Sequence, residues 1–199
     1  MSQQIETQID VTLTERNRLS ALFRIILVVP MVIFLSSFTP TNFSTWESDY
    51  LAIGFLFIPV ALSLVVRQIY PSYLLAFNEA FLSLSTRVDA YIFLLSDEYP
   101  SIEENEIVSV TFPLVDAKAL SRWLPLVKWF LAIPLYIVGI FYAIYAFFFL
   151  TIFAWFSILF TGRYPQRCAE GVVGAIAFWN RTLGYSILLV TDEYPSFSL

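Results

Sequence analysis

Three long stretches of this chain contain no acidic residue and almost no basic one. They cover residues 20–37, 50–66 and 129–160, and Arg24 is their only charged side chain. A bilayer core of roughly 30 Å takes about 20 helical residues to cross. Of the 199 residues 58% are hydrophobic and 14% are charged, whereas about a quarter of the residues of a soluble domain are charged. The sequence therefore predicts an all-α membrane protein.

Composition also narrows the classes of function. The formal net charge is −5, and because phosphate affinity depends on clustered Lys and Arg we expect no nucleic-acid partner. The chain has no His and a single cysteine, Cys168, so it has neither an internal disulfide nor the usual zinc and haem ligands. We expect Cys168 to be a small apolar residue, and we predict no catalytic residue, no metal and no cofactor.

An internal repeat is the most informative pattern in the sequence. At an offset of 94 residues, Pro71, Arg87 and Tyr91 are matched by Pro165, Arg181 and Tyr185. At an offset of 95, the motif Asp97-Glu98-Tyr99-Pro100-Ser101 recurs as Asp192-Glu193-Tyr194-Pro195-Ser196. Upstream, at an offset of 104, Arg18, Arg24 and Pro30 are matched by Arg122, Lys128 and Pro134. These matches divide the chain into two tandem repeats, residues 1–101 and 102–199.

Each repeat is expected to contain two transmembrane helices followed by one amphipathic interfacial helix. The predicted spans are 20–37 and 50–67 in the first repeat and 122–143 and 146–161 in the second, with a turn near Tyr142 to Ala146. The interfacial helices are predicted at 72–96 and 168–190. Apolar residues alternate at the start of each repeat, at Ile9, Val11 and Leu13 and at Val108, Val110 and Phe112. They predict short cytoplasmic strands that pair into a small ribbon.

Basic residues set the expected orientation, because Lys and Arg are retained on the cytoplasmic side of a membrane. If each repeat crosses twice, all 11 Lys and Arg residues fall on one side or at its interface. Both termini are then cytoplasmic, and the two repeats are parallel, related by an axis along the membrane normal. A third crossing in each repeat would move Lys118 and Arg122 outside, which the charge distribution disfavours.

The acidic motifs carry the candidate site residues, which are Asp97, Glu98, Asp192, Glu193, Arg87 and Arg181. A carboxylate at the C-terminal end of a helix faces the negative end of the helix dipole, which costs a few tenths to about 1 kcal/mol. One interpretation is that the acids form ion pairs, meeting Arg87 or Arg181 of the other repeat, or that they dock a partner or bind a cation. The other is that they are solvated helix stops followed by Pro100 and Pro195.

Several segments resemble a known family. They are Phe160 to Pro165, Trp179-Asn180-Arg181, Leu188 to Phe197, and Leu120 to Trp129 with Ala132-Ile133-Pro134. Together they are similar to a family of uncharacterised bacterial membrane proteins, a domain of unknown function whose tandem unit ends in a Thr-Asp-Glu-Tyr-Pro-Pro-Phe-like motif. The first half matches more loosely, since Ser96 stands where the second half has Thr191. The resemblance implies a bacterial inner (cytoplasmic) membrane location and no known activity.

From these observations we predict a non-enzymatic accessory or scaffold subunit of a bacterial inner-membrane assembly. Its expected partners are membrane lipids and either a larger membrane protein complex or further copies of the chain. The alternatives are a small transporter or channel with a path between the two repeats, and a lipid- or quinone-binding module that uses the aromatic third helices.

Overall fold

The structure, a computed structural model, describes residues 3–38, 56–103 and 106–198. It is mostly helical, and a single pair of short strands completes the regular structure of the described residues. The elements of the first half are β1 (Glu6–Ile9), α1 (Arg18–Leu27), α2 (Val29–Ser36), α3 (Phe57–Arg67) and α4 (Ser72–Ile92). Those of the second are β2 (Val108–Thr111), η1 (Leu124–Leu126), α5 (Lys128–Leu131), α6 (Ile133–Ala143), η2 (Ile144–Leu150), α7 (Thr151–Thr161) and α8 (Gln166–Ser186).

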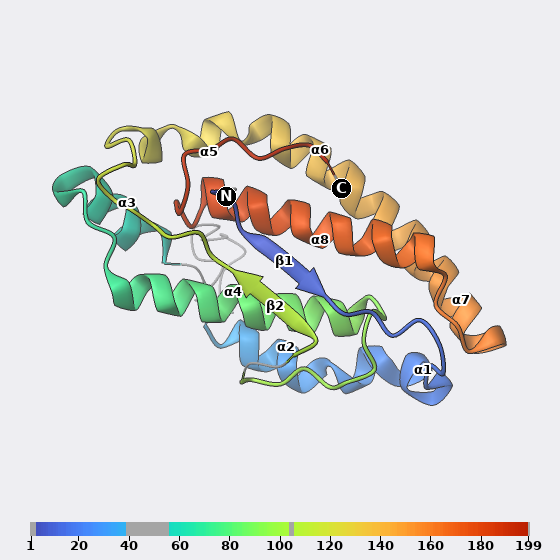
Figure 1. The fold of residues 1–199 in the computed structure, drawn as a ribbon. Coiled ribbons are helices and arrows are strands. Elements are labelled where there is room, and N and C mark those ends of the chain that lie inside the picture. The colour runs from blue at the N-terminus through green and yellow to red at the C-terminus, as the bar shows by residue number, and fades with distance from the viewer. Residues whose placement is uncertain (1–2, 39–55, 104–105, 199) are drawn as a thin grey trace, which may run out of the picture.

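The long helices lie in one layer with the strands on one of its faces (Figure 1). Helices α4 and α8 occupy the centre, and α1 with α2 and α6 with α7 form the two outer edges. The strands pair antiparallel in the register Glu6 with Thr111 and Ile9 with Val108, which confirms the predicted ribbon. One face of the ribbon packs on α4 and α8, so Val108 and Val110 are buried there.

The predicted second and third helices of each half begin and end at matched positions. Helix α3 ends at Arg67 and α7 at Thr161, and the next residues, Gln68 and Gly162, adopt the left-handed conformation that closes a helix. Helices α4 and α8 then start directly after Pro71 and Pro165, whose fixed φ suits a helix start. Loop residues 39–49 and the first part of the predicted span 50–67 lie outside the described residues.

Two helices are long and apolar enough to cross a membrane, Arg18–Ser36 and Ile133–Thr161. A break lies two residues before a proline in both cases, at Val28 in the middle of the first and at Ala132 directly before the second, because the proline ring removes a hydrogen-bond donor. The turn expected near Tyr142 to Ala146 is not formed. The chain instead passes from α6 through the wider π-helical turns of η2 into α7, since no proline, glycine or polar residue at that point breaks the helix.

The third helices are not amphipathic interfacial helices. In α4 the polar residues Asn78, Thr86 and Arg87 are buried together with the apolar Leu82 and Leu84. Helix α4 is covered by α2, α8 and β2, and α8 is covered by α6, η2 and β1. The polar side chains therefore face the protein interior, where hydrogen bonds satisfy Asn78 and Thr86. The helices also end earlier than predicted, at Ile92 and Ser186.

Glycine allows α6 and α8 to approach closely at one point. A Cβ atom at Gly139 would lie 2.9 Å from Cζ2 of Trp179 and 3.1 Å from Cε1 of Phe178. We expect Gly139→Val to lower the free energy of unfolding by about 1–3 kcal/mol, because two aromatic rings would have to move. Thermal unfolding in one detergent measures this. Ile140→Val, at a residue 53% exposed, is the control, and equal melting temperatures of the two variants would contradict the packing.

Candidate functional site

The first acidic motif meets a buried arginine, Arg24, from the last turn of α1. Arg24 is 2% exposed, and its Nη2 lies 2.5 Å from Oδ1 of Asp97. Nη1 of Arg24 donates to the carbonyl oxygens of Tyr91 at 2.9 Å and Ser96 at 2.7 Å. The guanidinium carbon lies 4.4 Å from the centre of the Tyr91 ring. Arg24 thus joins the first apolar helix to the end of the third.

Asp97 also contacts the N-terminal end of α1. The backbone N–H of Asn17, which caps this helix, donates to Oδ2 of Asp97 at 2.9 Å. The buried guanidinium of Arg16 approaches Oδ1 to 3.1 Å and donates to the carbonyl oxygens of Leu94 and Leu95. We call Arg16, Asn17, Arg24, Tyr91 and Asp97 the first ion-pair cluster.

The second acidic motif makes the matching contacts. Nζ of Lys128, which is fully buried, lies 2.7 Å from Oδ1 of Asp192 and donates to the carbonyl oxygen of Thr191 at 2.5 Å. The same Nζ lies 5.1 Å from the centre of the Tyr185 ring. The backbone N–H of Ser121 donates to Oδ2 of Asp192 at 2.6 Å. We call Ser121, Lys128, Tyr185, Thr191 and Asp192 the second ion-pair cluster.

The tyrosines of the acidic motifs complete both clusters in the same way. The Tyr91 and Tyr99 rings meet edge to face with centroids 5.7 Å apart, and those of Tyr185 and Tyr194 do so at 5.5 Å. The residue before each aspartate, Ser96 or Thr191, accepts a backbone hydrogen bond of 3.0 Å from the glutamate two positions on. The same contacts therefore recur in both halves of the chain.

This geometry removes the electrostatic cost that the sequence suggested. Each aspartate lies beyond the end of the third helix, and basic groups stand between it and the last carbonyl oxygens of that helix. The positive groups thus face the negative end of the α4 dipole, while Asp97 faces the positive end of α1. Both interactions are favourable, so the acids stabilise the fold at this position.

Burial and charge act in opposite directions on the basic groups. Burial lowers the pKa of Arg16 to about 10, although the neighbouring Asp97 raises it. Burial likewise lowers the pKa of Lys128, while the hydrogen bond and the charge of Asp192 raise it. The aspartates therefore favour the charged forms of both buried groups, and removing either acid would leave a buried basic group without its counter-ion.

The other predicted site residues lie elsewhere. Nη2 of Arg87 donates to the carbonyl oxygen of Ile102 at 3.3 Å, and Nη2 of Arg181 donates to that of Ser198 at 2.5 Å. Each arginine thus holds the tail that follows its own acidic motif. Glu98 and Glu193 are exposed. The structure differs from the expected cross-pairing, because Asp97 and Asp192 take Arg16, Arg24 and Lys128 as partners instead.

The clusters hold the chain together and leave little room for a bound ion. The oxygen atoms of both aspartates are directed at basic and backbone N–H groups of the same chain. Among the described residues, no three His, Cys, Asp or Glu side chains converge on a common point as metal ligands. Cys168 is a buried free thiol, and burial raises its pKa, so it is poorly suited to act as a nucleophile.

Replacing one acid tests the role of the first cluster. We expect Asp97→Asn to lower the free energy of unfolding by about 2–3 kcal/mol, because two buried guanidinium groups lose their counter-ion. The matched control is Glu98→Gln, the same chemical change at the exposed neighbouring residue, for which a change within about 0.5 kcal/mol is expected. Chemical unfolding in detergent micelles measures both. Equal effects would mean that the ion pairs do not stabilise the fold.

Comparisons with known proteins locate the second cluster within a family. No curated protein and no solved structure matches the chain. One family model does match, over residues 122–198, and it describes a domain of unknown function, DUF4389. The matched segment contains α5 to α8 and the second acidic motif, so it agrees with the uncharacterised family that the sequence resembles. The DUF4389 model thus matches residues 122–198 of this chain, which include Lys128 and Asp192.

Proposed function

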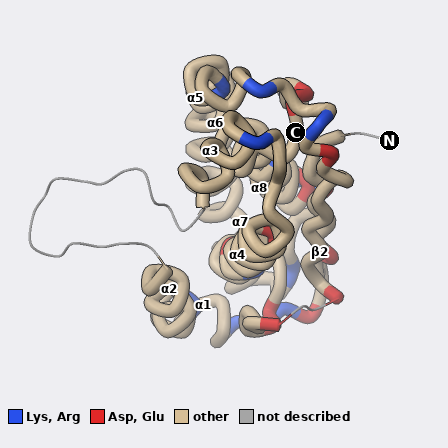
Figure 2. The backbone as a smooth tube through the Cα atoms, turned by 90° about the vertical axis from the view of Figure 1, so that its left-hand side faces the viewer, with Lys and Arg blue, Asp and Glu red and all other residues tan. Residues whose placement is uncertain are grey.

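We propose that this protein is a non-enzymatic accessory or scaffold subunit embedded in the bacterial inner membrane. The observation that carries the proposal is the distribution of charge over the helix layer. Charged residues gather on the side of the ribbon and of both chain ends (Figure 2), while α6, η2 and α7 expose large apolar residues such as Phe141, Phe148, Phe153 and Phe160. Such a surface is suited to lipid on one side and to a polar partner on the other.

The two halves of the proposed scaffold are repeats related by a pseudo-two-fold axis. Tyr70 donates to the carbonyl oxygen of Leu188 at 2.8 Å, and Tyr164, 94 residues on, donates to that of Phe93 at 3.2 Å. Each tyrosine thus binds the segment that follows the third helix of the other half.

Two contacting residues mark where this axis passes. Thr86 and Asn180 are also 94 residues apart, and Nδ2 of Asn180 donates to Oγ1 of Thr86 at 3.1 Å. Equivalent positions that touch one another lie next to the axis that relates them. The axis proposed here therefore runs between α4 and α8, roughly perpendicular to the helix layer, in which these two helices run in opposite directions.

The axis and the basic residues together favour one placement in the membrane. Lys128 precedes the long helix Ile133–Thr161 and Arg163 follows it, so a helix that crossed the bilayer would carry basic residues on both sides. We propose that both of its ends are cytoplasmic, with the helix layer embedded in the membrane and the ribbon facing the cytoplasm. The termini are then cytoplasmic and the axis is along the membrane normal, as the sequence predicts. A multi-pass arrangement would require a turn within the continuous helix.

The proposed docking surface is the ribbon side of the helix layer. Asp97 and Asp192 are engaged in ion pairs within the chain, whereas Glu98 and Glu193 are exposed beside them. Oε2 of Glu193 accepts a hydrogen bond from the backbone N–H of Gln3 at 3.1 Å. An acidic side chain on a rim selects a partner by charge. We therefore place the docking function on these two glutamates and assign the aspartates to the fold.

Single cysteines labelled on intact cells test the placement. In a Cys168→Ala background, Lys118→Cys and Arg167→Cys lie before and after the long helix, and Tyr145→Cys lies within it. We expect all three to resist a membrane-impermeant maleimide added from outside, because the first two are cytoplasmic and the third is in lipid. Labelling after permeabilisation should modify the first two only.

Other labelling patterns would replace this placement with a specific alternative. Outside labelling of the cysteine at 145 alone would mean that the helix breaks there and that each half crosses twice. Outside labelling of the cysteine at 167, with the cysteine at 118 protected, would mean that Ile133–Thr161 crosses once.

Charge reversal tests docking. Tagged protein is purified in nanodiscs from its own host, and stoichiometric partners are identified by mass spectrometry. We expect the double variant Glu98→Lys with Glu193→Lys to lose these partners, because the rim charge is inverted while both ion-pair clusters stay intact. Glu170→Lys, at an exposed acid outside the motifs, is the control. If the double variant keeps every partner, or the unaltered protein purifies as a lone homo-oligomer, the accessory role is wrong.

A further inference from the structure

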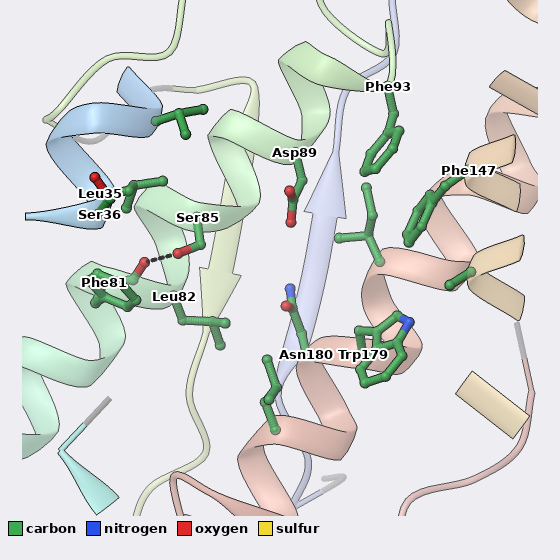
Figure 3. Close-up of a pocket in the computed structure, with 14 residues that line it drawn as sticks. Leu35, Ser36, Phe81, Leu82, Ser85, Asp89, Phe93, Phe147, Trp179 and Asn180 are labelled. Atoms are coloured by element: carbon green, nitrogen blue, oxygen red, sulfur yellow. Dashed lines mark hydrogen bonds between the residues drawn. The ribbon is translucent and has the colours of Figure 1, made fainter. Parts of the chain in front are cut away.

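A cavity of about 600 Å³ lies between the two halves, beside the Thr86–Asn180 contact. Its walls come from α2, α4, α6, η2 and α8, and most of them are apolar or aromatic, including Phe81, Phe93, Phe147 and Trp179. Figure 3 shows the carboxylate of Asp89 and the amide of Asn180 facing each other across this space. A chamber of this size with few polar groups is typical of a small-molecule site.

Asp89 is the charged residue of this cavity. Among the described residues its carboxylate makes no hydrogen bond and no ion pair, although the helix around it is well packed. The residue 94 positions on is Leu183, which also lines the cavity. Helix α8 thus packs with an apolar side chain at the position that matches Asp89. Packing of a third helix therefore does not require a carboxylate there. An unpaired carboxylate in an apolar wall calls for a ligand.

The neighbouring donors are already engaged. The hydroxyl of Ser85 donates to the carbonyl oxygen of Phe81 at 2.8 Å. That of Thr86 donates to the carbonyl oxygen of Leu82 at 2.8 Å, so towards Asn180 it can only accept. This fixes the orientation of the amide, whose Nδ2 donates to Thr86 and, at 2.9 Å, to Thr7. The amide group of Asn180 therefore has only its oxygen left to offer.

Two polar groups that remain towards the cavity are acceptors, the negatively charged carboxylate of Asp89 and the amide oxygen of Asn180. Nε1 of Trp179, another lining residue, is a buried donor without a partner among the described residues. A matching ligand must bring N–H donors, a positive charge and an apolar body. Aromatic rings in the wall favour the same choice, because a cation is attracted to the face of an aromatic ring. A fatty acid would bring a second negative charge, and a neutral quinone would leave the charge of Asp89 unpaired.

We propose that this cavity binds the protonated amine of a single-chain amphiphile, with the ammonium group at Asp89 and Asn180 and the hydrocarbon chain between the aromatic residues. The site is separate from both ion-pair clusters, and it does not depend on the docking function. The described residues that line the cavity include no other titratable side chain. Protonation neutralises the carboxyl group of Asp89, so the affinity for amines falls as the solution is acidified.

Dodecylamine is the probe, and dodecanol is its matched neutral control. Binding to the full chain is measured in phosphatidylcholine nanodiscs by native mass spectrometry, and by the increase in melting temperature. We expect saturable binding of dodecylamine at pH 8, at least about tenfold weaker binding at pH 5.5, and no comparable binding of dodecanol.

Two variants with the same chemical change separate the charge from the fold. Asp89→Asn should weaken dodecylamine binding at pH 8 by at least about tenfold and remove its pH dependence. Glu79→Gln, on α4 outside the cavity lining, should leave binding unchanged. Asparagine resembles the protonated acid in shape, so the variant is expected to fold, and its melting temperature without ligand verifies this. Equal binding of amine and alcohol, or unchanged binding by Asp89→Asn, would overturn the proposal.

Filling the cavity provides a test that leaves the charge in place. Ala143→Phe adds a ring to the wall and should abolish dodecylamine binding, and full retention of binding would place the amine elsewhere. Nanodiscs that contain lysophosphatidylethanolamine, a single-chain lipid with a primary amine, then distinguish the two sources of the amine. A weaker apparent affinity for dodecylamine there would mean that the lipid amine occupies the site, whereas an unchanged affinity would assign the site to a free amphiphile.

Discussion

The fold depends on the neutralisation of a buried basic group near the N-terminal end of the first apolar segment in each half. Arg24 and Lys128 are almost inaccessible to water, and a buried cation without a counter-ion would be strongly destabilising. The counter-ion of Arg24 is Asp97, 73 residues later in the sequence, and that of Lys128 is Asp192, 64 residues later. Each half is therefore stable only when the segment that follows its third helix lies against the first apolar segment, where the basic group is buried.

That closure explains why the aspartate follows the third helix by several residues. A chain reversal after α4 and α8 places Leu94 and Leu189 in the left-handed region, which is costly for a residue with a branched side chain. The cost is offset because the reversal turns the carbonyl oxygens of Ser96 and Thr191 towards the buried cation. One turn thus supplies both the charged partner and the neutral hydrogen-bond acceptors.

The sequence predicts the helices better than it predicts their surroundings. The repeat offset predicted the positions of the third helices and the acidic motifs. The alternation of apolar residues at the start of each repeat predicted the ribbon. Hydropathy could not show whether residues 129–160 turn, because an uninterrupted apolar run suits a hairpin and a single helix equally. The amphipathic pattern of α4 predicts that its polar face is in contact with water, yet Asn78 and Thr86 are buried. A 3.6-residue period shows which residues are polar, but it does not show whether water or another part of the protein forms their hydrogen bonds.

The partners of the acids were missed for a related reason. Arg24 and Lys128 had a signal in the sequence, since they occupy matched positions 104 residues apart at the starts of apolar segments that otherwise lack charge. Basic residues at the ends of apolar segments are usually interpreted as indicators of orientation in the membrane. Here Arg24 and Lys128 are also the counter-ions of Asp97 and Asp192.

Asp89 follows the opposite pattern, since its matched position is the apolar Leu183. Charges that recur in both halves hold each half closed, whereas an unpaired charge in only one half is not explained by the shared fold. The asymmetry between otherwise matched halves is therefore the better guide to a binding site here than the motif that both halves share.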